Sequence, residues 1–261
     1  MKAGYDDNFV LGSCVQVLKK TTQLQPSSVR LLLADGPYGV NYSSQDETIE
    51  AIDDDKTLEA ALKLHENMLK AMEPYMMSDC HIMLFCDKRY EPEFRQLVLK
   101  AGYQFKDSLI WHKGDGGRPI PNQSLRNHER IIWFTKGKPR ILTNMTDVLD
   151  HPRYRSSEET RDTSHPTPKP LNLLSDLIEV ATTEGELLVD PFAGSGSTLI
   201  AAKQLGRKYF GVEKKKKWFR EGTVLLKKAE RIQPVDAQSS APAVNAVFVS
   251  NTQQELLPNV A

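Results

Sequence analysis

Short apolar runs alternate with amphipathic segments over most of the chain. Apolar and β-branched runs bounded by turn residues predict strands, and apolar positions repeating every three or four residues predict helices that bury one face. The expected strands span residues 31–34, 82–85, 105–111, 130–134, 187–189 and 208–212. The expected helices span residues 57–72, 92–102, 169–181 and 197–205.

The alternation of strands with helices predicts an α/β fold in which a doubly wound sheet carries helices on both faces. Its clearest unit is residues 187–212, which read as strand, helix and parallel strand. Residues 141–164 have weak periodicity and many polar side chains, so we expect an irregular insertion there. Residues 233–261 mix Pro, Ala, Ser and Gln, which predicts a mobile tail with residues 247–249 as an optional edge strand.

A chain of 261 residues can bury a sizeable core, and we expect a single domain over residues 1–232. The insertion separates a first half, residues 9–140, from a second half, residues 165–232. Each half contains one turn whose residue types indicate chemistry.

The second half contains a glycine-rich turn, DPFAGSGST at residues 190–198, between an expected strand and an expected helix. Gly194 and Gly196 allow a tight turn and the close approach of a ligand, and Glu213 follows the next strand, where a carboxylate meets ribose hydroxyls. A phosphate-binding P-loop needs a lysine after its glycines and a dinucleotide site needs a third glycine, and both are missing from this turn. The segment therefore indicates a nucleoside cofactor without phosphates, such as S-adenosylmethionine.

The first half contains DGPYG at residues 35–39, at the end of the first expected strand, where open α/β sheets bind ligands. The Asp35 carboxylate and the Gly36 carbonyl can accept hydrogen bonds from an exocyclic amine and expose its lone pair to an electrophilic methyl group. Tyr38 can stack on a base that is flipped out of the duplex. The alternative interpretation is a plain tight turn.

The two turns resemble the motifs of the DNA amino-methyltransferase family, in which a DPPY-type motif performs the chemistry and an FxGxG-type motif binds S-adenosylmethionine. The catalytic motif comes first here, an order similar to that of the β group of the family. Four further segments are similar to family motifs, namely VLGSCVQVLKK at 10–20, LRNHERIIWFTKG at 125–137, HPTPKP at 165–170 and GRKYFGVE at 206–213. The resemblance covers about residues 9–231.

The resemblance implies a Rossmann-like fold with a mostly parallel, seven-stranded sheet and methyl transfer from S-adenosylmethionine to a DNA base, in a bacterium or a phage, without a metal. The residues that it implies for catalysis are Asp35, Gly36, Pro37 and Tyr38. The residues that it implies for cofactor binding are Asp35, Thr167, Lys169, Asp190, Pro191, Phe192, Ala193, Gly194, Gly196 and Glu213.

This chain departs from the family pattern at two positions. Gly36 replaces the first proline of DPPY, which keeps the carbonyl but loses the fixed φ, so we expect a less preorganised turn and keep a catalytically impaired binding module as an alternative. Ser13 replaces an aspartate of the opening segment, which removes one contact to the cofactor's adenosine. The aspartate at the head of the catalytic motif favours adenine N6 as the target, with cytosine N4 as the alternative. An RNA or protein substrate has less support, because no segment resembles an RNA-binding module.

Double-stranded DNA is the expected macromolecular partner even though the formal net charge is zero, because basic residues concentrate locally. The residues expected to contact DNA are Lys113, Arg118, Arg126, Arg153, Arg155 and Arg161. The insertion occupies the family's target-recognition position and is only 24 residues long, which predicts a short or relaxed target sequence. A homodimer stays open beside a monomer.

Composition adds little that is specific, since 39% hydrophobic and 26% charged residues are ordinary for a globular protein. No apolar run approaches the roughly 20 residues of a membrane-spanning helix, and residues 1–20 lack the pattern of a signal peptide, so a cytoplasmic protein is expected. Cys14, Cys80 and Cys86 form no CxxC pair, so we expect buried reduced thiols rather than a metal site or disulfides.

Overall fold

A computed structural model describes residues 8–40, 55–114, 127–153, 165 and 167–231, which form an eight-stranded sheet in the order β1-β8-β7-β2-β3-β5-β4-β6. The strands are β1 (Phe9–Leu11), β2 (Val29–Ala34), β3 (Met76–Cys86), β4 (Gln104–His112), β5 (His128–Lys136), β6 (Val148–Asp150), β7 (Leu187–Asp190) and β8 (Lys208–Glu213). The helices are α1 (Cys14–Lys20), α2 (Leu58–Met72), α3 (Glu91–Lys100), α4 (Leu171–Ala181), α5 (Ser197–Gln204) and α6 (Lys216–Lys228), with a 3₁₀ turn at Glu73–Tyr75. The expected α/β class with a mostly parallel sheet is confirmed.

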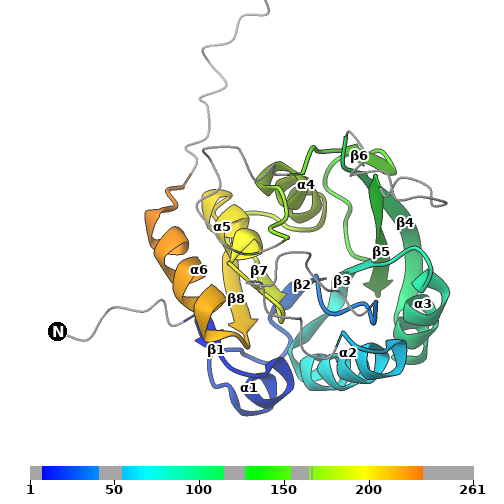
Figure 1. The fold of residues 1–261 in the computed structure, drawn as a ribbon, viewed down its shortest axis with the longest axis horizontal. Helices are drawn as coiled ribbons and strands as arrows, with labels where there is room; N and C mark the ends of the chain where they lie inside the picture. The colour runs from blue at the N-terminus through cyan, green and yellow to red at the C-terminus, as the bar shows by residue number, and fades with distance from the viewer. Residues whose placement is uncertain (1–7, 41–54, 115–126, 154–164, 166, 232–261) are drawn as a thin grey trace, which may run out of the picture.

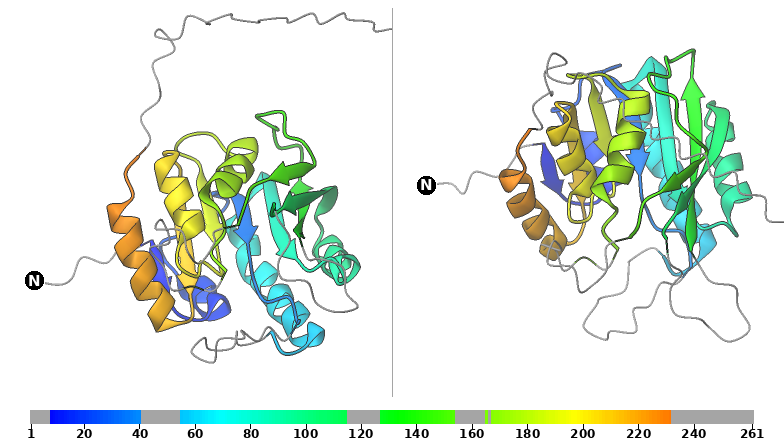
Figure 2. Two further views of the ribbon diagram at one scale, coloured as in Figure 1. Left: turned by 45° about the horizontal axis from the view of Figure 1, so that its top comes forward. Right: turned by 90° about the horizontal axis from the view of Figure 1, so that it is seen from above.

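Helices cover both faces of the sheet, with α4 and α5 above it and α1, α2 and α3 below it in Figure 1. One hydrophobic core lies between the sheet and the lower helices and includes Leu18 of α1 and Phe94 of α3. A second core lies between the opposite face and α4 and α5 and includes Leu177. The further views in Figure 2 show the sheet between these two sets of helices. The expected doubly wound arrangement is therefore present.

Strand direction decides which residues meet at each edge of the sheet. β5 is antiparallel to both of its neighbours, β3 and β4, and the other neighbouring strands are parallel. The carboxyl ends of β2, β7 and β8 therefore lie at the same edge as the start of β5. This edge brings together Asp35, Asp190, Glu213 and Glu129 from segments that are far apart in the sequence.

The helix expected at residues 57–72 is confirmed as α2, and its signals are local. The Thr57 side chain accepts a hydrogen bond from the Ala60 backbone N–H at 3.2 Å, which caps the first turn. Ala61, Met68 and Met72 repeat at helical spacing and are buried. The helix therefore begins and faces the core as the sequence predicts.

The expectation of seven strands is wrong, because Val148–Asp150 in the supposedly irregular insertion forms β6. Its three residues pair in parallel with the last three residues of β4, and Leu149 is buried against the core. Three residues are too few to carry a periodic pattern, so only the pairing partner reveals the strand. Strand β1 and helices α1 and α6 were also not predicted. The expected tail and its optional edge strand lie outside the described residues.

The described residues also bear on membrane insertion and on cysteine chemistry. None of the helices among them is long and apolar enough to span a membrane. Cys14, Cys80 and Cys86 are all buried and free, as expected. In the same part of the chain, no group of three or more His, Cys, Asp or Glu side chains is placed to hold a metal ion.

Candidate functional site

Two turns lie side by side where the sheet changes its direction of winding. β2 and β7 are neighbours, and the chain leaves β2 through α2 toward β3 but leaves β7 through α5 toward β8, on the other side. Such a switch point opens a crevice beyond the carboxyl ends of the strands, where open α/β sheets bind ligands. We call residues 35–40 the β2 turn and residues 190–196 the β7 turn.

The β7 turn is held mainly by its own backbone. The Phe192 N–H donates to Asp190 Oδ1 at 2.9 Å, and the Gly196 N–H donates to the Ala193 carbonyl at 2.7 Å. Gly194 has φ 54° and Gly196 has φ 84°, a left-handed backbone that favours glycine. α5 begins directly after this turn, so its first backbone N–H groups lie beside the crevice.

Glu213 at the end of β8 ties the β7 turn to the neighbouring strand. Its carboxylate accepts hydrogen bonds from the backbone N–H groups of Gly194 at 2.8 Å and Lys215 at 2.6 Å. Burial raises the pKa of Glu213, and it raises the pKa of Asp190 to about 7. Two buried carboxyl groups therefore lie under the turn.

The β2 turn is held from outside by Asp55, which the sequence analysis did not single out. Asp55 Oδ1 accepts hydrogen bonds from the backbone N–H groups of Tyr38 and Gly39, both at 2.7 Å, and of Val40 at 3.3 Å. The side chain lies just before α2, and Asp55 is only 2% exposed. Three donors on one buried carboxylate fix the backbone of the turn. The only sequence signal was the position of Asp55 at the end of an acidic run.

Asp35 is the first member of an alternating chain of charges. Its Oδ1 accepts a hydrogen bond from the Tyr38 hydroxyl, and its Oδ2 accepts one from the Lys169 ammonium. Lys169 also lies 3.5 Å from Glu129 Oε2, and Lys113 donates to Glu129 Oε1. The order of charges is thus Asp35, Lys169, Glu129 and Lys113, and each charge faces one of opposite sign.

Burial and the neighbouring charges decide the protonation of this cluster. Burial and then the carboxylates of Asp35 and Glu129 raise the pKa of Tyr38 well above its ordinary value, so its hydroxyl remains a donor. Burial alone would lower the pKa of Lys169, but Asp35 and Glu129 raise it overall, and Lys169 stays a cation. Burial alone would raise the pKa of Glu129, but Lys169 and Lys113 lower it overall. At neutral pH Glu129 is therefore ionised, Lys169 is a cation and Tyr38 is neutral.

Aromatic side chains form the wall beside these charges. The Lys169 ammonium lies 4.9 Å from the ring centroid of Phe85 and 5.8 Å from that of Trp111. Lys113 lies 4.9 Å from the centroid of Trp111. Cations over aromatic faces are attracted to the ring, and the rings exclude water from the ion pairs. The Asp35 side chain remains 24% exposed, so a ligand can reach it from the crevice.

Most sequence-predicted site residues lie at this edge of the sheet, but their partners differ from the expectation in places. Lys169, expected to bind the cofactor, contacts Asp35 instead of the β7 turn. Lys113, expected to contact DNA, lies in the interior ion-pair chain with a side chain only 15% exposed. Thr167 is partly buried, and its backbone N–H donates to His165 Nδ1 at 3.3 Å.

The remaining residues expected to contact DNA are only partly described. Arg153 is exposed at the same edge of the sheet, and its backbone N–H donates to the Lys113 carbonyl at 3.4 Å. This hydrogen bond connects the chain just after β6 to the chain just after β4. The others, Arg118, Arg126, Arg155 and Arg161, lie outside the described residues.

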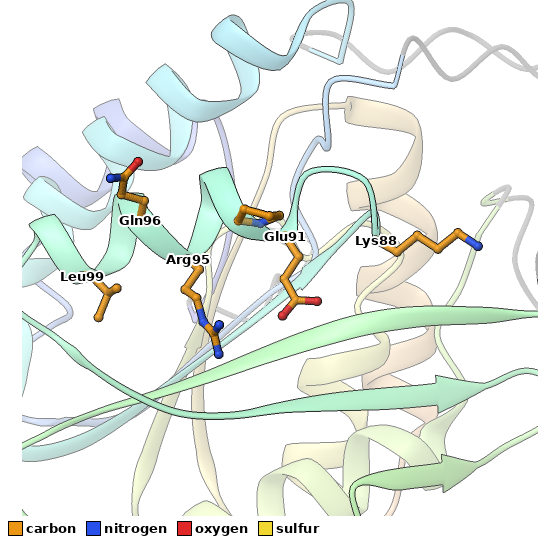
Figure 3. A pocket seen from close by; sticks show the side chains of 6 residues that line it. Lys88, Glu91, Arg95, Gln96 and Leu99 are labelled. Atoms are coloured by element: carbon orange, nitrogen blue, oxygen red, sulfur yellow. The ribbon is translucent and has the colours of Figure 1, made fainter.

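A pocket of about 510 Å³ on the outer side of α3 does not coincide with this site. In Figure 3 the side chain of Arg95 points from α3 toward the strands, and Leu99 lies one turn further along. The lining residues are Lys88, Glu91, Pro92, Arg95, Gln96 and Leu99. None of them belongs to the two turns or to the charge chain, so the crevice at the switch point is the better candidate.

The chain is similar to known DNA methylases in sequence and in fold. A family model described as DNA methylase, for N6 and N4 enzymes, matches residues 29–223. "Putative methylase YubD" of Escherichia coli (strain K12) is 29% identical over 225 residues, which are 85% of this chain and 91% of that protein. The crystal structure of the M1.HpyAVI-SAM complex has a TM-score of 0.64 at 23% identity and covers 84% of this chain and 98% of its own. The cytosine-N4-specific PvuII DNA methyltransferase has a TM-score of 0.67 at 15% identity, covering 89% and 87%.

Proposed function

The chain belongs to this family of N6 and N4 DNA methylases, and on that premise we propose that it transfers a methyl group from S-adenosylmethionine to the N6 amino group of adenine in double-stranded DNA. The observation that carries the proposal is the pair of adjacent turns at the switch point. One turn has a carboxylate, a backbone carbonyl and an aromatic ring, and the other has the glycines and the acidic neighbour of a nucleoside site.

The residues around the β7 turn fit the cofactor. S-adenosylmethionine, when bound, supplies a methyl group on a positively charged sulfur. Glu213 accepts hydrogen bonds from the backbone N–H groups of Gly194, Lys214 and Lys215, and a carboxylate offers about four acceptor positions, which leaves one for a ribose hydroxyl. Phe192 offers a partly exposed ring in the same turn. The turn has no lysine for phosphates, in keeping with a cofactor that has none.

The β2 turn can activate an exocyclic amine. The Asp35 carboxylate and the Gly36 carbonyl accept hydrogen bonds from the two amino hydrogens, which exposes the nitrogen lone pair, and Tyr38 stacks on the flipped base. The amino group shares Asp35 with Lys169 and Tyr38, because each carboxylate oxygen can accept a second hydrogen bond. Lys169 donates a hydrogen bond to Asp35, so the acceptor is held in position before the base arrives.

Cytosine N4 is the second candidate target. Its exocyclic amine needs the same geometry, and the PvuII enzyme, which is cytosine-N4-specific, shares the fold. Adenine remains favoured because aspartate heads the catalytic motif. Exposed Arg153 would approach the duplex at the same edge.

The test is nucleoside mass spectrometry of unmethylated DNA after incubation with the protein and S-adenosylmethionine. We expect N6-methyladenine, reduced at least about 10³-fold in Asp35→Ala, because the amine loses the acceptor that activates it. Asp107→Ala, a change at an exposed position on β4, is the matched control and should leave the yield unchanged. N4-methylcytosine would move the assignment to the second target, and no modified base would favour the catalytically impaired alternative.

A further inference from the structure

Gly36 in the β2 turn has no room for a side chain. A Cβ atom on Gly36 would lie 2.7 Å from His65 Nε2, 2.8 Å from His65 Cε1 and 2.8 Å from Phe192 Cε2. Contacts this short do not occur in folded proteins without a shift of the neighbouring atoms. Gly36 is not among the glycines with positive φ, so its backbone is one that other residues can adopt. The space taken by His65 and Phe192, and not the backbone conformation, requires glycine here.

His65 is a buried imidazole that the proposed chemistry does not use. It lies on α2, is 0% exposed and has Nδ1 2.9 Å from the Ala61 carbonyl, so Nδ1 carries the proton. Nε2 then keeps its lone pair and, within the described residues, has no hydrogen-bond partner. Burial lowers the pKa of His65 to about 4, so the ring is neutral at ordinary pH. A polar atom left without a partner in a core is costly, which indicates that the shape and position of this ring matter.

The ring of His65 links the two turns. It packs on Phe192 of the β7 turn with ring centroids 5.2 Å apart, and its edge meets Phe94 of α3 at 4.9 Å. On its remaining side it faces Gly36 of the β2 turn. One side chain thus contacts the turn that offers the amine acceptors and the turn that fits the cofactor.

We propose that His65 is a positioning residue whose imidazole fills the space that the first proline of a DPPY-type motif would occupy, and so sets the position of the Gly36 carbonyl relative to the β7 turn. The proposal rests on the proposed methyl transfer. It reverses the expectation that glycine merely loosens the catalytic turn. Residues 36 and 65 form a matched pair, in which a larger residue at one position requires a smaller one at the other. Gly36→Pro should therefore slow the enzyme instead of restoring it.

A double-mutant cycle on the full chain tests this pairing, with Gly36→Ala, His65→Ala and the combined variant. Methyl transfer to DNA at saturating S-adenosylmethionine gives kcat, and calorimetry gives the cofactor dissociation constant. We expect each single change to lower kcat about 30-fold, because a displacement of the Gly36 carbonyl misplaces the amine. The combined variant should recover to within about fivefold of the unaltered protein, because Phe192 can tilt into the space left by the imidazole and admit the new methyl group.

A second buried histidine supplies the matched control. His81 is also 0% exposed, but it accepts from the Trp133 indole and lies near the Arg140 carbonyl, away from Gly36. His81→Ala should lower the melting temperature, and it should not rescue Gly36→Ala. Melting curves of every variant separate a loss of folding from a loss of rate, and Gly36→Ser with His65→Ala repeats the cycle should a first variant fail to fold.

The outcomes separate this inference from the proposed function. Recovery of kcat in the combined variant, with a cofactor dissociation constant close to that of the unaltered protein, supports the positioning role. Methyl transfer by the unaltered protein with losses that simply multiply in the combined variant would overturn the positioning role alone. Absence of methyl transfer by the unaltered protein would overturn the proposed function and the positioning role with it.

Discussion

The β2 turn and the β7 turn lie side by side at one edge of the sheet, but different contacts hold them. The β7 turn bonds partly to itself, through Asp190 to the Phe192 N–H and through the Gly196 N–H to the Ala193 carbonyl. Two further hydrogen bonds go to β8, where Glu213 accepts from the Gly194 N–H and the Val212 carbonyl accepts from the Ala193 N–H. The β2 turn instead takes its three main hydrogen bonds from Asp55, which lies in another segment. The turn that fits the cofactor is thus held by its own residues and by β8, whereas the turn that offers the amine acceptors is held by the side chain of Asp55 before α2.

This difference predicts two distinct effects of substitution. Changes at the distant supports of the β2 turn should slow methyl transfer and leave cofactor binding intact, because the β7 turn does not need them. Changes within the β7 turn should act on cofactor binding or on stability first. If such variants lowered both the rate of methyl transfer and the affinity for the cofactor, the two turns would not be supported separately.

Among the residues that support the two turns, Asp55 is expected to show the largest effect when it is replaced by alanine. The change leaves three backbone N–H groups without their acceptor, at roughly 1–3 kcal/mol each when buried, so the β2 turn should relax. We expect kcat to fall about 100-fold with a cofactor dissociation constant changed less than about twofold. Asp55→Asn, which keeps one acceptor oxygen, should lose less activity. A matching loss of cofactor affinity would show that the two turns are not supported separately.

A smaller effect is expected from Lys169→Met. The ammonium balances Asp35 and Glu129, so its loss leaves two buried carboxylates facing each other and should lower kcat about 10-fold. If Lys169 acts on Asp35, as its contacts indicate, the cofactor dissociation constant should stay unchanged in calorimetry. Lys63→Met, which removes an exposed ion pair with Glu66, is the control and should change neither quantity. A rise in the cofactor dissociation constant at constant kcat would show instead that Lys169 binds the cofactor, as the family resemblance implies.

The smallest effect is a pH-dependent change of stability in Asp190→Asn. Burial raises the pKa of Asp190 to about 7, above its ordinary value in the unfolded chain. A raised carboxyl pKa adds stability at low pH that is lost as the pH rises from about 4 through about 7. Asparagine cannot ionise, so the variant avoids this loss. We expect the melting temperature of the variant minus that of the unaltered protein to rise by roughly 5 °C between pH 5 and pH 8. Asp107→Asn at an exposed position should show no such trend, and a constant difference at all pH values would contradict the burial of an ionisable Asp190.

The same contrast explains which features of the fold and of the site the sequence predicts. The α2 cap at Thr57 depends on contacts within a few residues, and the β7 turn and the βαβ unit depend on one strand–helix–strand segment, residues 187–213. The sequence predicts each of them. Glu129 reaches the site only through the pairing of β2, β3 and β5, and Asp55 only through the placement of the chain before α2, and no local pattern encodes either. The same holds for β6, whose three residues are recognisable only by their pairing with β4.

His65 had a sequence signal that a closer reading could have used. It lies four residues after Ala61 and four before Leu69, in phase with the buried stripe of α2. A histidine on an apolar stripe indicates a buried ring but does not reveal its neighbour. Only the packing of α2 against the sheet places it on Gly36, and the apparent defect in the motif then becomes a matched pair.

Amide hydrogen exchange tests most directly whether Asp55 holds the β2 turn while the β7 turn is held without it. The amides of Tyr38 and Gly39 should exchange slowly in the unaltered protein and much faster in Asp55→Ala, while those of Phe192 and Gly196 should exchange at the same rate in both. Unchanged protection of Tyr38 and Gly39, or equal loss in both turns, would contradict the account.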